Sequence, residues 1–106
     1  MTVAGATVLV VGAGYPGKLR VYQRFHELGV RTAVVDEPGH WSESLVRDGL
    51  AAAWVPAPVT GEPDRDAAAV LEALGRANLK VDAVLTFWED SVSVVARVAA
   101  ALGLPA

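Results

Sequence analysis

Cysteine is absent from this chain of 106 residues. Its absence excludes a disulfide framework, a thiolate nucleophile and any metal site built on cysteine. An excess of positive charge is also missing, because the formal net charge is -3 and the pI is near 5.2. A protein that binds the nucleic-acid backbone needs a basic stripe to displace counterions, so we expect no nucleic-acid partner.

Long hydrophobic runs are missing as well. The N-terminal segment 1–6 is apolar but has no basic flank, and the apolar run ends at Gly12, short of membrane-spanning length. We therefore expect no signal peptide, no membrane anchor and a cytoplasmic location.

Histidine is scarce, and neither His26 nor His40 has a ligand partner at metal-binding spacing. No serine has a base partner that the sequence reveals. The sequence thus predicts neither a metal site nor a catalytic residue in this chain.

Hydrophobic residues make up 53% of the chain and charged residues 20%, which predicts a single folded domain over residues 1–106. Apolar β-branched runs alternate with segments of helical periodicity. The expected strands are 7–11, 32–35, 52–55 and 82–87; the expected helices are 16–28, 42–48, 64–78 and a last one from 90 or 91. Such alternation predicts an α/β fold, a four-stranded parallel Rossmann-like sheet of order 3-2-1-4 with helices on both faces.

Two details of the helices follow from residue type. Asp64 is predicted to cap the third helix, and Asp90 or Ser91 the last one. The apolar positions expected to form the buried face of the last helix are Val92, Val95, Ala96, Ala99 and Leu102.

A glycine-rich turn follows the first strand and opens a helix, with the sequence Gly12-Ala-Gly14-Tyr15-Pro-Gly17. This G-x-G-x-x-G pattern favours a phosphate at the start of the helix, and Asp36 follows at the distance of a ribose-binding acid, which suggests NAD. Alternatively, the glycines only solve a steric problem in a tight turn, and Tyr15 adds bulk there.

The segment 86–90 is expected at the C-terminal end of the fourth strand, where open α/β sheets place ligands. There Glu89, beside Trp88, is suited to receive a substrate ammonium, or else it only stabilises the helix dipole. His40 lies in a loop expected at the same edge of the sheet. Lys18 is the one amine near the glycine-rich turn, where it either touches an anionic group or is solvated.

Four segments, taken together, resemble a known family. Segments 10–14 (Val-Val-Gly-Ala-Gly), 34–38 (Val-Val-Asp-Glu-Pro), 85–90 (Leu-Thr-Phe-Trp-Glu-Asp) and 101–105 (Ala-Leu-Gly-Leu-Pro) resemble the pre-ATP-grasp, N-terminal domain of ATP-grasp ligases. The run at 85–90 looks especially like carnosine synthases and related L-amino-acid ligases. The similarity covers essentially the whole chain.

The resemblance implies a ligase that activates a carboxylate with ATP as an acyl phosphate and joins it to an amine. It implies that Glu89, Trp88 and His40 face a small amino-acid substrate, and that Gly12, Gly14, Tyr15, Gly17 and Lys18 lie near the phosphoryl-transfer centre. ATP and Mg²⁺ would be bound mainly by an ATP-grasp lobe in cis that is absent from this chain, so the chain alone is expected to bind no cofactor and to be inactive. A homo-oligomer is compatible with the sequence.

Two other interpretations stay open. One is an NAD-binding module of an oxidoreductase, supported by the glycine-rich turn and Asp36. The other is a stand-alone interaction domain.

Overall fold

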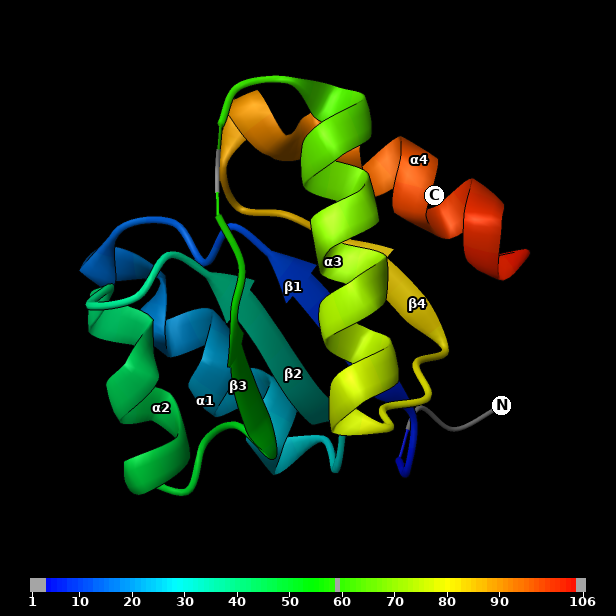
Figure 1. Cartoon of the computed structure of the whole chain (residues 1–106). Helices are drawn as coiled ribbons and strands as arrows, with labels where there is room; N and C mark the ends of the chain where they lie inside the picture. Colours follow the sequence, from blue (N-terminus) through cyan, green and yellow to red (C-terminus); the bar gives the residue numbers. More distant parts are fainter. Residues whose placement is uncertain (1–3, 59, 105–106) are drawn as a thin grey trace.

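A four-stranded parallel sheet forms the centre of the computed structural model, which describes residues 4–58 and 60–104 (Figure 1). The strands lie in the order β3-β2-β1-β4. They are β1 (Thr7–Val11), β2 (Arg31–Asp36), β3 (Ala53–Pro56) and β4 (Ala83–Leu85). The predicted fold class and strand order are confirmed.

Each strand is followed by helical structure. The α-helices are α1 (Leu19–Glu27), α2 (Ser44–Arg47), α3 (Pro63–Ala77) and α4 (Val92–Leu102). Three of them begin with a short 3-10 helix: η1 (Pro16–Lys18), η2 (Trp41–Glu43) and η3 (Glu89–Ser91). The 3-10 turns were not predicted; η1 begins at Pro16, whose fixed φ suits a first helical position.

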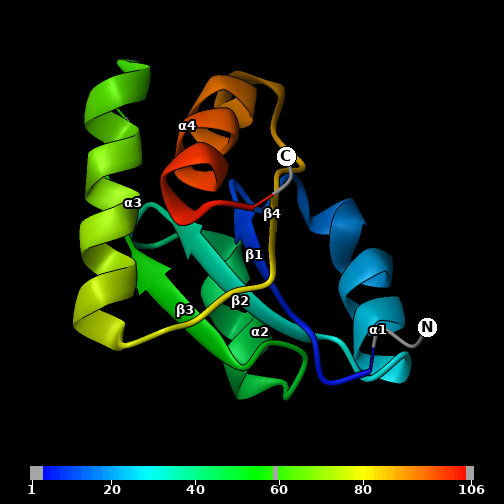
Figure 2. The ribbon, with the colours of Figure 1, turned by 90° about the vertical axis from the view of Figure 1, so that its right-hand side faces the viewer.

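The helices cover both faces of the sheet, and each face has its own core (Figure 2). On one face α3 and α4 pack against Leu9, Val35 and Val84 of the strands. On the other face α1 and α2 place Tyr22 and Leu45 against alternate strand residues. Central strands buried on both sides explain why β1 and β2 are continuous apolar runs rather than alternating ones.

The cap prediction for the third helix is wrong. Glu62 is the N-cap of α3 and its side chain accepts a hydrogen bond from Arg65 N at 2.6 Å. Pro63 occupies the first turn, where a missing N–H costs nothing, so the cap has to precede it. Asp64 instead pairs with Arg97 of α4 and links the two helices.

The predicted buried face of α4 is wrong in part. Val95 and Ala99 are buried as expected, but Ala96 is exposed, and Val92 and Leu102 are 57% and 41% exposed. Val98 is fully buried in place of those residues, together with Val94. Valine and alanine make up most of this helix, including exposed positions, so its hydrophobic periodicity shows little contrast between the two faces.

Among the residues that the structure describes, no helix combines the length and apolarity needed to cross a membrane.

Candidate functional site

The carboxyl ends of β1 and β4 bring two loops into contact. Phe87 N donates to Gly12 O at 3.1 Å, which joins the glycine-rich turn to the loop before η3. All strand pairs are parallel, so the loops that follow the strands share one edge of the sheet. Gly14, His40 and Glu89 therefore lie at one edge, as the sequence predicts.

The fold of this chain itself requires glycine at positions 12 and 14. Their φ angles are 81° and 80°, in the region that other residues rarely adopt. A Cβ on Gly14 would lie 2.9 Å from Phe87 Cβ, and one on Gly12 would lie 3.0 Å from Ser91 Oγ and from Trp88 Cβ. Gly17 differs, because no described neighbour lies within 4 Å of a Cβ built there and its φ is not positive.

The polar groups of the glycine-rich turn are largely engaged within the chain. Gly12 N donates to Val35 O at 3.0 Å, and Ala13 N donates to a carboxylate oxygen of Asp36 at 2.9 Å. Ala13 O accepts from Tyr22 OH at 3.0 Å, and Gly14 O accepts from Trp41 Nε1 at 2.8 Å. Two of the amides that a phosphate cradle would use therefore already have acceptors.

Asp36 faces this turn rather than the solvent. It is 9% exposed, and its second carboxylate oxygen accepts from Glu37 N at 2.8 Å. Burial of Tyr22, and secondarily the Asp36 carboxylate near it, raises the pKa of the Tyr22 phenol, so that phenol stays a hydrogen-bond donor. A ribose-binding acid has to present its oxygens to the cofactor, so this placement disfavours the NAD interpretation.

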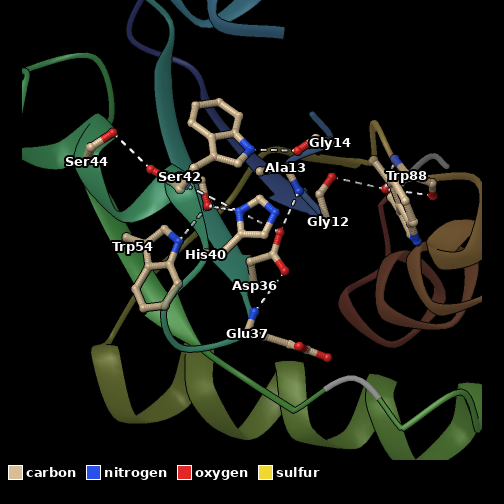
Figure 3. Close-up of polar contacts among 12 residues, drawn as sticks. Gly12, Ala13, Gly14, Asp36, Glu37, His40, Ser42, Ser44, Trp54 and Trp88 are labelled. Carbon is tan, nitrogen blue, oxygen red and sulfur yellow. Dashed lines mark hydrogen bonds and ion pairs between the residues drawn. The ribbon is translucent and has the colours of Figure 1, made fainter. Parts of the chain in front are cut away.

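His40 is held by a chain of hydrogen bonds that the sequence did not reveal (Figure 3). Trp54 Nε1 donates to Ser42 Oγ at 2.9 Å, and Ser42 Oγ lies 2.8 Å from His40 Nδ1. Ser42 N also donates to His40 Nδ1 at 3.3 Å. Because the backbone N–H of Ser42 donates to Nδ1, Nδ1 is an acceptor and the neutral imidazole carries its proton on Nε2.

His40 borders a hollow at the edge of the sheet. The hollow has a volume of about 300 Å³, and its walls include Gly14, Tyr15, Trp41 and Trp88. The Asp36 carboxylate lies 3.5 Å from His40 Nδ1, so a protonated His40 would have a carboxylate partner. The structure thus brings His40, Trp88, Gly12, Gly14 and Tyr15 together around one hollow.

Glu89 is exposed at the first position of η3, beside an aromatic pair. The rings of Tyr15 and Trp88 meet edge to face, with centroids 5.1 Å apart. Together with Phe87, Glu89 and Asp90 they line a second hollow of about 290 Å³. A carboxylate next to aromatic faces is suited to receive an ammonium group.

The structure corrects the role predicted for Asp90. The residue before η3 is Trp88 and the residue before α4 is Ser91, and neither makes a side-chain capping hydrogen bond. Asp90 is an exposed residue inside the 3-10 turn and caps nothing. Thr86 Oγ1 orders the preceding loop instead, by accepting from Trp88 N at 2.9 Å.

Lys18 and Gly17 lie on the outer side of the turn. Lys18 is exposed, and its ammonium group is 5.7 Å from the centre of the Phe87 ring, at cation–π distance. The proximity of Gly12, Gly14, Tyr15, Gly17 and Lys18 to a phosphoryl group stays a prediction.

Asp66 is a buried carboxylate that the sequence analysis missed. It is 4% exposed and accepts from Thr60 N, Thr60 Oγ1 and Gly61 N, at 2.6–3.1 Å. Burial alone would raise the pKa of Asp66, but the hydrogen bonds from Thr60 and Gly61 outweigh it and lower that pKa. Its position in the first turn of α3 was the available signal.

The residues described do not fit a resident Mg²⁺ ion. Across 4–58 and 60–104 there is no group of three or more His, Cys, Asp or Glu side chains that could hold a metal. No step of ATP chemistry is therefore assigned to these residues.

The comparisons with known proteins identify the family and support the fold. The family model of the ATP-grasp N-terminal domain matches residues 22–106. The chain therefore belongs to the ATP-grasp N-terminal domain family. The crystal structure of phosphoribosylglycinamide synthetase from Anaerococcus prevotii has the same fold, with a TM-score of 0.66 and 24% identity over 94% of this chain and 23% of that one.

Two curated relatives are enzymes of greater length. Carnosine synthase 1 from Gallus gallus is 35% identical over 97% of this chain and 11% of its own length. The ATP-grasp enzyme fsqD from Aspergillus fumigatus is 29% identical over 81% of this chain and 15% of its own length. The chain thus spans only a small part of the curated relatives that it matches.

Proposed function

We propose that this chain is the substrate-side, N-terminal lobe of an ATP-dependent carboxylate–amine ligase that joins a small amino acid to a carboxylate. In this proposal ATP and Mg²⁺ supply the activation of the carboxylate as an acyl phosphate, on residues of a separate ATP-grasp lobe in the same polypeptide. This chain contributes one wall of the substrate cleft and is not catalytic alone.

The observation that carries the proposal is the exposed carboxylate of Glu89 beside the Tyr15–Trp88 pair. Glu89 receives the ammonium group of the amino acid through a charge-assisted hydrogen bond, and the aromatic faces contact the carbon next to that charge. His40, with Nδ1 occupied by Ser42, presents Nε2–H as a donor to a substrate oxygen across the neighbouring hollow.

The similarity to carnosine synthase 1 supports a ligase of that kind as the complete enzyme. The engagement of Gly12 N and Ala13 N by Val35 and Asp36 supports a nucleotide site on the other lobe.

The test is the Glu89→Gln variant of a complete ligase that carries this domain. Glutamine keeps the size of the side chain but removes the charge, at an expected loss of about 1.5–3 kcal/mol of ammonium binding. We expect kcat/KM for the amino acid to fall roughly ten- to over a hundredfold, while KM for ATP stays unchanged.

Glu72→Gln is the matched control, because Glu72 is an exposed glutamate on α3 and lines none of the hollows at the sheet edge. It should leave both parameters at the wild-type value. A Glu89→Gln enzyme with wild-type kcat/KM, or one that loses only ATP affinity, would contradict the proposal.

A further inference from the structure

Two side chains outside the hollow that His40 borders are joined to its ring by hydrogen bonds (Figure 3). Trp54 belongs to β3 and Ser42 to η2, and neither lines the hollow. Trp54 packs against the core on the side of α1 and α2, and Ser42 is fully buried. Any effect of these two side chains on a ligand in the hollow therefore passes through His40.

The direction of these hydrogen bonds follows from the chemistry of the groups. An indole N–H can only donate, so Trp54 Nε1, which lies 2.9 Å from Ser42 Oγ, makes that oxygen an acceptor. The hydroxyl proton of Ser42 is then directed to His40 Nδ1, at 2.8 Å. The backbone N–H of Ser42 donates to the same nitrogen, at 3.3 Å. Both donors of Ser42 thus converge on Nδ1.

The other neutral tautomer of His40, with its proton on Nδ1, would disrupt this arrangement. It would leave the hydroxyl proton and the N–H of Ser42 without an acceptor among the described residues, at a fully buried residue. A buried donor without a partner costs more than an average hydrogen bond contributes. Asp36 Oδ2 could accept from Nδ1–H, but it lies farther away, at 3.5 Å, and already accepts from Ala13 N.

We propose that Ser42 and Trp54 are positioning residues that fix His40 as the Nε2–H tautomer, so that the hollow offers an N–H donor to an acceptor oxygen of a ligand. No described residue accepts from Nε2, and the His40 side chain is 27% exposed. Capping of η2 by His40 needs only the backbone N–H of Ser42, so it explains neither the hydroxyl nor the indole. The consequence for the amino-acid substrate rests on the proposed function.

Ring ¹⁵N shifts of the two histidines in the 106-residue chain test the proposal without any substrate. At alkaline pH histidine imidazoles are neutral, and these shifts report which nitrogen carries the proton. We expect His40 almost wholly as the Nε2–H tautomer. His26 is the internal control, because it is exposed and no described residue hydrogen-bonds to its ring. It should show a mixture of both tautomers.

Two variants each remove one donor that acts on His40. The ratio of the Nε2–H to the Nδ1–H tautomer should fall about fivefold in Ser42→Ala, which loses the hydroxyl. It should fall about twofold in Trp54→Phe, because the hydroxyl proton of Ser42 can then turn away from the ring. Trp41→Phe is the matched control, since the indole of Trp41 donates to Gly14 O, and the ratio should stay at the wild-type value.

Kinetics of a complete ligase that carries this domain test the consequence for the substrate. Ser42→Ala should lower kcat/KM for the amino acid about fivefold in the presence of His40, and should have no effect in a His40→Gln background. An effect of Ser42→Ala that is equal in both backgrounds would contradict a role through His40.

The NMR result decides the proposal even where a variant does not fold. A mixture of tautomers at His40 in the wild-type chain, or an unchanged ratio in either folded variant, would overturn it. The failure of the proposed function looks different. If His40 is a single tautomer that both variants disturb, while His40→Gln keeps wild-type kcat/KM, the positioning role stands and the substrate contact assigned to His40 is wrong.

Discussion

Gly14 and Gly17 belong to one sequence motif but differ in what the fold requires of them. Gly14 combines a φ of 80° with a Cβ position 2.9 Å from Phe87 Cβ. Gly17 has open space around it among the described residues. The fold therefore requires glycine at position 14 of this motif, whereas the described residues place no constraint on position 17.

Replacing each glycine by alanine separates the two cases. Gly14→Ala should lower the free energy of unfolding by about 1–3 kcal/mol, through backbone strain and the clash with Phe87. Gly17→Ala should be neutral or stabilising by up to ~1 kcal/mol, because glycine is costly at a helical position. Urea denaturation measures both; equal losses would show that the contact with Phe87 does not set the requirement.

Asp66 gives the fold a defined response to acid. Its folded-state pKa is lowered, so its contribution to stability is present above the pKa of an unfolded aspartate, about 3.9. That contribution is lost as the pH falls through the lowered folded-state pKa. Asp66→Asn should cost about 1–3 kcal/mol near neutral pH, because the amide group opposes the donors of Thr60 and Gly61.

The measurement is urea denaturation of both proteins from pH 7 downward. The stability difference between wild type and Asp66→Asn should be constant near neutrality and shrink below about pH 4. A difference that does not change with pH would show that the Asp66 charge plays no part.

At the scale of single elements, the sequence predicted correctly the limits of β1 and the end of α3. The first depends on a hydrophobic run and the second on a helix-stop residue. β1 was predicted at its observed limits, because a strand buried on both faces is a continuous apolar run bounded by Gly12. The Asn78 stop of α3 was predicted too, and Asn78 adopts the left-handed conformation of a helix C-cap. Helix faces and caps that depend on tertiary packing were predicted less well.

Two valines of α4, Val98 and Val92, test that distinction within one helix. Val98→Ala removes a fully buried side chain from the core on that face, and we expect a loss of about 1–3 kcal/mol in the free energy of unfolding. Val92→Ala makes the same change at a residue that is 57% exposed, and the expected effect is within about 0.5 kcal/mol. Similar losses for both would place Val92 in the core, as the periodicity alone suggested.

From the sequence, the candidate site could be predicted only as a group of residues at the same edge of the sheet. Parallel strands place Gly14, His40 and Glu89 at one edge, and that part follows from topology. The chain from Trp54 through Ser42 to His40, and the bond from Trp41 to Gly14 O, join residues far apart in sequence. No local pattern encodes such bonds, because they depend on how the loops after β1 and β2 pack together.

At the scale of the whole molecule, the described residues form one four-stranded sheet with a core on each face, and the hollows lined by Asp36, His40 and Asp90 lie at one edge. The glycine-rich turn at that edge is held by its own neighbours rather than left open as a phosphate cradle. This arrangement is consistent with the proposed role, in which this chain forms one side of the substrate cleft and the ATP chemistry takes place on another lobe.

Calorimetric titration of the 106-residue chain with Mg²⁺ and ATP, and separately with NAD, tests that account most directly. Gly12 N and Ala13 N already have acceptors within the chain, and the described residues hold no cluster that fits Mg²⁺. We therefore predict no binding of either nucleotide in the micromolar range. Micromolar affinity for ATP would contradict a substrate-side lobe, and comparable affinity for NAD would support an oxidoreductase module instead.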